Sequence, residues 1–195
     1  MTVAEVVPGL RRWTAWHEEW GEDVGCLAVE TDDGLVLIDP LDPPRQLARP
    51  AHVLLTVYWH ARSAEGPNVW AHRRAAAPLA RRGIGLTHPF VPGDPLPGGI
   101  RAFATARTGE VVYWLPRQRA LVVGDVLLGA GARPRPTRDP LRLCPARWLG
   151  GATHADLRSS LRPLLELPLA RVLVSHGAPV LRGGRRALAA CLARP

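Results

Sequence analysis

The chain has 195 residues, 47% hydrophobic content and a formal net charge of +8. This length suits one well-buried core, so we expect a single domain over residues 1–195. No apolar run reaches the roughly eighteen residues that a membrane-spanning helix needs. Residues 1–5 lack the charged-then-apolar pattern of a signal peptide. We therefore expect a cytoplasmic protein that does not associate with membranes.

The positive charge does not by itself indicate a nucleic-acid partner. All 25 basic residues are arginine, and they are scattered along the chain instead of alternating with aromatic residues. Nucleic-acid binding needs clustered cations, often with stacking aromatic side chains between them. The abundance of Arg, Ala, Pro and Gly is typical of a GC-rich coding bias. We expect no nucleic-acid partner.

Short apolar runs bounded by turn residues dominate the first half of the chain and predict strands. An Asp-Gly turn within residues 31–34 predicts a hairpin between the first two of these runs. An Ala/Arg-rich segment predicts a helix near residues 73–82. The predicted strands cover residues 24–30, 35–39, 51–56, 68–71, 100–105, 110–115 and 120–124.

The last third of the chain has a different pattern. Residues 129–151 are rich in Arg, Pro and Gly without periodicity, which is typical of a functional or disordered loop. Leucines at helical spacing then predict a helix over residues 156–167, with Thr153 as a plausible cap. A strand over 171–174 and a closing helix over 183–193 follow. This order predicts an α/β or α+β fold with helices outside sheets.

Three ordered segments carry a resemblance to a known family. They are GCLAVETDDGLVLIDP, ending near Asp39; LVVGDVLLG, containing Asp125; and SLRPLLELPLARVLVSHGAPV, containing His176. Their order and spacing resemble the metallo-β-lactamase superfamily, particularly its glyoxalase II-like hydrolases. The resemblance implies an α+β fold built as a four-layer αβ/βα sandwich. It also implies hydrolysis assisted by one or two zinc ions, held by converging His and Asp side chains.

Most of the zinc ligands that this resemblance implies are missing. Aligned on Thr56, the family's T-H-x-H-x-D-H motif places Val57, Trp59, Ala61 and Arg62 at its four ligand positions. A later histidine position holds Arg107. Of seven ligand positions, only Asp125 and His176 keep a donor. The helix that follows this motif in the family is shortened or lost, because a strand is predicted from residue 68.

The remaining residues support two hypotheses. We predict that no dinuclear zinc site forms and that no metal cofactor is needed. In that case Asp125 and His176 are relics of the catalytic set, and Asp39, His60, Arg62 and Arg107 line a cleft. The ligand would be a small anionic molecule or a protein partner. The alternative is an active hydrolase of ester or thioester substrates with one zinc on Asp125, His176 and His60.

Two structural expectations bear on this choice. His60 is one residue out of register with the missing histidines, and on an extended segment its side chain would point to the other face. Arg62 and Arg107 could offset the charge of Asp125 where a metal is missing. We expect one or both arginines to reach Asp125, with Arg107 the better candidate because its segment keeps the family spacing.

Overall fold

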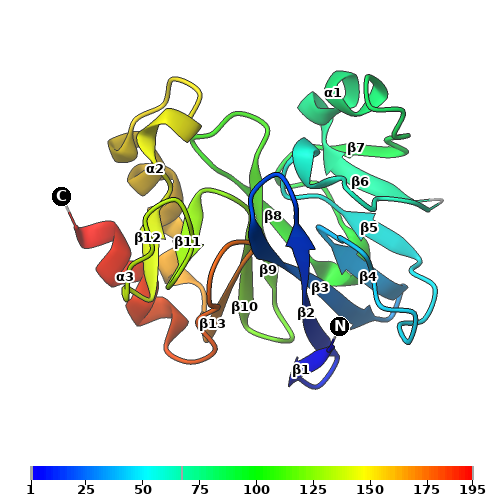
Figure 1. Cartoon of the computed structure of the whole chain (residues 1–195), viewed down its shortest axis with the longest axis horizontal. Helices are drawn as coiled ribbons and strands as arrows, with labels where there is room; N and C mark the ends of the chain where they lie inside the picture. Colours follow the sequence, from blue (N-terminus) through cyan, green and yellow to red (C-terminus); the bar gives the residue numbers. More distant parts are fainter. Residues whose placement is uncertain (1, 67, 195) are drawn as a thin grey trace.

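The computed structural model describes residues 2–66 and 68–194, and its strands form two main sheets (Figure 1). The larger sheet has seven strands in chain order. They are antiparallel from the first to the fourth strand and parallel from the fourth to the seventh. The strands are β1 (Ala4–Val7), β2 (Leu10–His17), β3 (Glu22–Thr31), β4 (Gly34–Ile38), β5 (His52–Leu54), β6 (Val69–His72) and β7 (His88–Phe90).

The smaller sheet has four strands in the order β13-β10-β9-β8. Strands β10 and β13 are parallel, whereas β9 pairs antiparallel with both β10 and β8. A separate pair, β11 and β12, follows β10. The strands are β8 (Arg101–Ala104), β9 (Val111–Leu115), β10 (Ala120–Val123), β11 (Leu127–Gly129), β12 (Leu141–Leu143) and β13 (Arg171–Val174).

Helices are short and lie outside the two sheets (Figure 1). Thr153 caps the second α-helix in a capping box with Asp156, which confirms the predicted cap. The α-helices are α1 (Ala76–Ala80), α2 (His154–Leu161) and α3 (Gly184–Ala193). The 3-10 helices are Tyr58–His60, Arg73–Ala75, Pro97–Gly99, Ala146–Trp148 and Arg162–Glu166.

Three buried clusters show that the molecule has four layers. Alternate residues of β3 point to opposite faces: Leu27 joins the cluster between the sheets, and Cys26 joins the outer cluster that includes Leu79 of α1. The central cluster takes side chains from both sheets, such as Ile38 and Tyr113. The third cluster lies between the smaller sheet and helices α2 and α3. This arrangement confirms the predicted four-layer αβ/βα sandwich.

The structure corrects several predicted elements. Strands β1, β2 and β7 were not predicted, and residues 129–151 are not a structureless loop. Strand β12 lies within that segment and pairs with β11, so its backbone is hydrogen-bonded. The predicted helix over 156–167 ends early as an α-helix and continues as the 3-10 helix Arg162–Glu166, whose Pro163 cannot donate a backbone hydrogen bond.

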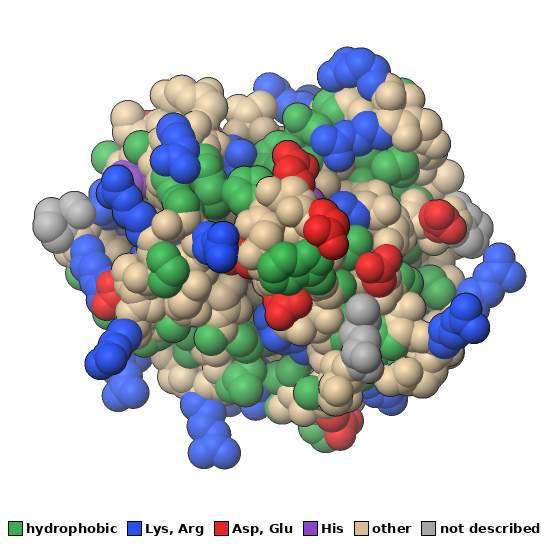
Figure 2. Space-filling view, in the orientation of Figure 1, with side chains coloured by type: hydrophobic (Ala, Val, Ile, Leu, Met, Phe, Trp, Pro, Cys, Tyr) green, Lys and Arg blue, Asp and Glu red, His purple; other side chains and the backbone are tan. Residues whose placement is uncertain are grey.

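The outer surface shows no single basic patch on the face in view. Figure 2 shows arginine side chains dispersed across this face, whereas acidic side chains gather near its centre, over the β2–β3 hairpin. All three cysteines are buried and unpaired. Within residues 2–66 and 68–194, none of the helices has the length and apolar character to cross a membrane.

Candidate functional site

The candidate site lies where strands of both sheets end. Asp39 follows β4, and His60 ends the 3-10 turn after β5; in the other sheet, Asp125 follows β10 and His176 follows β13. Because β4 and β5 are parallel, and β10 and β13 are also parallel, each pair of carboxyl ends meets at one sheet edge. An isolated β-bridge between Val24 and His176 joins the two sheets there.

Three buried side chains converge on one point between these sheet edges. His60 Nε2 lies 3.1 Å from Asp125 Oδ1, and His176 Nε2 lies 3.2 Å from the same oxygen. The side chains of His60, His176 and Asp125 are only 3%, 3% and 4% exposed. Their donor atoms all lie within 4.8 Å of one another. The donor atoms of two imidazoles and one carboxylate therefore surround one small region.

A carboxylate contacts the Nδ1 atom of each imidazole, on the side of the ring away from Asp125. Asp39 Oδ2 lies 2.8 Å from His60 Nδ1, and Glu22 Oε1 lies 2.7 Å from His176 Nδ1. Asp39 is itself fixed by Thr56, whose backbone N–H and hydroxyl both donate to it, at 2.8 and 2.5 Å. These contacts orient both rings so that each Nε2 faces Asp125.

The charges in this cluster shift its proton affinities. Burial alone would lower the pKa of His60, but the charges of Asp39 and Asp125 outweigh burial and raise it to about 9. Burial would raise the pKa of Asp125, but the neighbouring His60 and His176 hold it well below its usual range. Without a metal, His60 is therefore an imidazolium at neutral pH that links two carboxylates.

The second oxygen of Asp125 has partners of its own. Trp59 Nε1 donates to Asp125 Oδ2 at 2.7 Å, and Arg107 Nη1 lies 3.5 Å from the same atom. The Arg107 guanidinium also stacks over the Trp59 ring at 4.3 Å and donates to Glu110 Oε2 at 3.3 Å. The expected contact between Arg107 and Asp125 is therefore present. Trp59 and Arg107 occupy two of the lost ligand positions and still face the site.

Glu110 supports the turn that carries Asp125. Its Oε1 accepts hydrogen bonds from the backbone N–H groups of Asp125 and Val126, at 2.7 and 2.9 Å. Burial raises the pKa of this carboxyl to about 7, with a further contribution from the Asp125 charge. Gly124 permits the close approach, because a Cβ there would lie 2.5 Å from Thr56 Oγ1 and 2.9 Å from Glu110 Oε1.

A cleft of about 420 Å³ opens above the three converging side chains. Aromatic rings and arginines dominate its wall, and such a volume suits a small organic molecule. Its lining residues are His17, Glu19, Trp20, Tyr58, Trp59, His60, Arg62, Arg82, Arg107, Asp125, Trp148 and His176.

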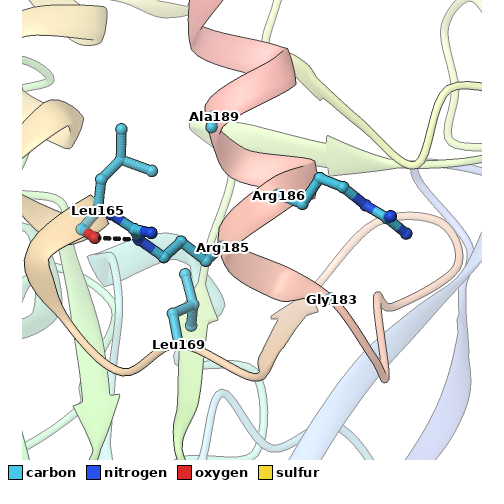
Figure 3. Close-up of a pocket in the computed structure, with 6 residues that line it drawn as sticks. All are labelled: Leu165, Leu169, Gly183, Arg185, Arg186 and Ala189. Atoms are coloured by element: carbon cyan, nitrogen blue, oxygen red, sulfur yellow. Dashed lines mark hydrogen bonds between the residues drawn. The ribbon is translucent and has the colours of Figure 1, made fainter.

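A second depression, at the start of α3, offers different chemistry (Figure 3). Leu165, Leu169, Gly183, Arg185, Arg186 and Ala189 line it. Arg185 Nε donates to the Leu165 carbonyl at 2.7 Å, so this arginine stabilises the backbone next to the depression. No histidine or carboxylate lines this depression in the described part of the chain. The converging histidines and the Asp125 carboxylate line the cleft instead.

The structure brings together most of the residues that the sequence selected. The structure links Asp39, His60 and Asp125 by hydrogen bonds, and His176 joins them through its ion-pair contact with Asp125. Arg62 lines the cleft, but within the described residues it forms no ion pair with Asp125. The expectation that His60 points away is wrong, because this segment is a 3-10 turn and not an extended strand. Residues 61–66 and 68, between this turn and β6, contain no helix, which confirms that the helix after the motif is shortened or lost.

The sequence analysis did not assign a role in the site to four residues that the structure places there: Glu22, Trp59, Trp20 and Glu110. Glu22 and Glu110 are single carboxylates outside any motif, and only the fold shows their partners. Trp59 was considered only as a lost ligand, although its indole N–H is a donor. Of the tryptophans near the N-terminus, Trp13 is buried in the core, whereas Trp20 is 37% exposed and lines the cleft.

The donor set fits a single divalent metal ion. Zinc bonds to nitrogen and oxygen of about 2.0–2.1 Å place tetrahedral ligands roughly 3.3 Å apart. The separations of 3.1 and 3.2 Å from Asp125 Oδ1 to the two Nε2 atoms are close to this value. The carboxylates on both Nδ1 atoms are the outer partners typical of metal-bound histidines. His60, Asp125 and His176 would be the ligands.

Comparison with known proteins supports the fold assignment. No protein-family profile and no curated protein sequence matches the chain. Among solved structures, a metallo-beta-lactamase from Pontibacter korlensis is similar at 17% identity, with a TM-score of 0.69 over 100% of this chain and 99% of that one. A metallo-beta-lactamase from Erythrobacter litoralis has 17% identity and a TM-score of 0.68, covering 97% and 93%.

A metallo-beta-lactamase family protein from Thermus thermophilus has 16% identity and a TM-score of 0.63. This match covers 95% of this chain and 80% of that protein. The four layers, the strand ends that carry Asp125 and His176, and these three similarities agree. The chain has the metallo-β-lactamase fold.

Proposed function

We propose that this protein is a hydrolase of small ester or thioester substrates that uses one metal ion held by His60, Asp125 and His176. The observation that carries the proposal is the paired anchoring of the two histidines. Asp39 and Glu22 hold the Nδ1 atoms, and both Nε2 atoms face one oxygen of Asp125. When bound, a divalent metal supplies a nucleophile from water at neutral pH and polarises the carbonyl that is attacked.

The other residues of the cleft have distinct tasks in this proposal. Trp59 and Arg107 hold Oδ2 of Asp125 in place. Oδ1 then faces the two histidines and is free to bind the metal. The aromatic wall binds the apolar part of the substrate and excludes water. The overall reaction joins water to the ester or thioester and yields a carboxylic acid and an alcohol or thiol.

Charge balance supports a metal at this point. A divalent ion bound by two neutral imidazoles would displace the proton that makes His60 an imidazolium at neutral pH. The carboxylates Asp39, Asp125 and Glu22, which raise the proton affinity of the two imidazoles, would offset the charge of the ion.

A second candidate function is a metal-free binding cleft. It is favoured by the contact between Arg107 and Asp125 and by the imidazolium of His60, which together offset the buried carboxylates. In this form the cleft would bind a small anionic ligand without catalysis. The metal content of the purified protein separates the two candidates.

The test of the proposed function is an activity assay with defined metal content. The protein is stripped with a chelator, reloaded with zinc, manganese or iron(II), and assayed on p-nitrophenyl esters and on aromatic thioesters. We expect hydrolysis only after reloading, and His60→Ala should reduce kcat/KM at least about a hundredfold. His72→Ala, which removes an imidazole outside the cleft, is the matched control. Equal hydrolysis by the stripped protein would contradict the proposal.

A further inference from the structure

Three arginines line the cleft, and two of them are already engaged. Arg107 pairs with Glu110 and Asp125 and stacks over Trp59. The Arg82 guanidinium lies over the Tyr58 ring, 5.3 Å from its centroid. Both cations therefore contribute to the wall of the cleft.

Arg62 differs from the other two. Its Nε and Nη2 atoms are covered from solvent, and no hydrogen-bond acceptor reaches them from residues 2–66 and 68–194. Nδ1 of His17, which also lines the cleft, is likewise buried without a partner among these residues. His17 and Arg62 both line the cleft, and burial, followed by the Arg62 charge, lowers the pKa of His17.

Leaving such groups unsatisfied is costly. A buried donor without a partner loses the hydrogen bonds that it made to water, and the loss is greater for a charged group. A guanidinium that lines an open cleft can turn its planar fork toward a ligand. A carboxylate matches this fork because it accepts two parallel hydrogen bonds.

The acidic residues of the cleft do not fill this role. Among the lining residues in the described part of the chain, only Glu19 and Asp125 are acidic. Asp125 is occupied by His60, His176, Trp59 and Arg107. As far as the structure describes the chain, Glu19 forms no ion pair with Arg62. The cleft therefore keeps a surplus cation.

The aromatic wall indicates what the anionic group is attached to. Trp20 meets Trp148 edge to face, with ring centroids 5.4 Å apart, and Tyr58 meets Trp59 at 4.7 Å. Both pairs line the same cleft. Flat apolar groups pack well against such rings.

We infer that Arg62, with His17 beside it, anchors a carboxylate of the substrate, and that the substrate is a small carboxylic acid with an aromatic or other flat apolar body. For catalysis this inference rests on the proposed function: the same molecule would carry the ester or thioester toward His60, Asp125 and His176. Binding of the carboxylate itself does not depend on a metal.

The test is calorimetric binding of benzoate to the metal-free protein, with benzamide and inorganic phosphate as further probes. We expect benzoate to bind, benzamide to bind at least about tenfold more weakly, and Arg62→Gln to weaken benzoate at least about tenfold. Arg82→Gln removes the same charge from the same cleft and is the matched control; its effect should stay within about threefold. Arg62→Lys, which keeps the charge but lacks the fork, should fall between wild type and Arg62→Gln.

Several outcomes would overturn the inference. Benzoate could fail to bind the wild type, or bind Arg62→Gln as well as the wild type. Equal losses of benzoate affinity in the Arg62 and Arg82 variants would mean that the anion responds to the overall positive charge of the cleft and not to a specific contact with Arg62. Phosphate bound more tightly than benzoate would make the ligand a phosphoryl compound. Because no step uses metal or hydrolysis, a negative result in the activity assay leaves this test unaffected.

Discussion

Each sheet contributes an arginine to the cleft: Arg62 follows β5 of the larger sheet, and Arg107 follows β8 of the smaller sheet. The two arginines differ in whether their guanidinium groups have partners. On one side, the Arg107 guanidinium meets two carboxylates and an indole ring and is part of the structure. On the other side, Arg62 has buried nitrogens that find no acceptor among the described residues. Both arginines stand at positions that the sequence resemblance aligned with histidine ligands. The surroundings, and not the residue type, therefore decide whether an arginine of the cleft pairs within the protein or keeps nitrogens without an acceptor among the described residues.

The largest expected effect is on the Arg107 side, on removal of the shared carboxylate. Asp125→Ala leaves His60, His176 and Arg107 without their common partner in a buried site. We expect a loss of about 3–5 kcal/mol in the free energy of unfolding, measured by urea denaturation of the metal-free protein. Asp32→Ala, which breaks an exposed ion pair with Arg117, should change little. A small effect of Asp125→Ala would show that the cluster does not stabilise the fold.

A double-mutant cycle tests the contact between Arg107 and Asp125 directly. The Arg107 side chain is 16% exposed and Asp125 is 4% exposed, so water screens the pair only partly. We expect a coupling energy of about 1–3 kcal/mol from Asp125→Ala, Arg107→Leu and the double variant. Additive effects would mean that the two charges do not interact, and Arg107 would then be available to a ligand in the same way as Arg62.

The same substitution on the other side should behave differently. Arg62→Leu removes a partly buried cation that lacks acceptors, so its loss breaks no hydrogen bond to a described residue. We expect the free energy of unfolding to stay unchanged or to rise by about 1 kcal/mol. The measurement is the same urea titration as for Arg107→Leu. A loss comparable to that of Arg107→Leu would remove the contrast between the two sides.

The smallest expected effect is on the reactivity of Cys26, whose thiol interacts electrostatically with Arg62. The charge of Arg62 favours the thiolate, but burial dominates and raises the pKa of Cys26 to about 12. Burial also raises the pKa of Cys144 to about 12 and that of Cys191 to about 11. All three should therefore remain thiols at about pH 8 and resist a disulfide reagent in the folded protein. Rapid labelling of Cys26 would show that the Arg62 side opens or activates this thiol.

The sequence predicted the fold well because the signals that specify it are local. Hydrophobic runs and turn residues located most strands, and the segments around Asp39, Asp125 and His176 set their order. Strand β2 was missed because its buried positions, such as Leu10, Trp13 and Ala15, do not alternate regularly. The pairing of β11 with β12 crosses a Pro-rich segment whose composition suggests no strand.

The site was predicted less completely, because it depends on contacts between distant segments. Glu22 and His176 are 154 residues apart, and no spacing rule connects them. The direction of His60 depended on whether its segment is extended or turned. With about three residues per 3-10 turn, a one-residue offset does not reverse the side chain as it does in a strand.

The most direct test of the hydrolase proposal is the metal stoichiometry of the purified protein. We expect about one zinc, manganese or iron per chain after metal-replete expression, measured by elemental analysis. His60→Ala should lose this metal, whereas His72→Ala should keep it. Two metals per chain would contradict a site limited to His60, Asp125 and His176. If the wild-type protein bound no metal even after reloading, the hydrolase proposal would be wrong, and the metal-free binding cleft would be the remaining candidate function.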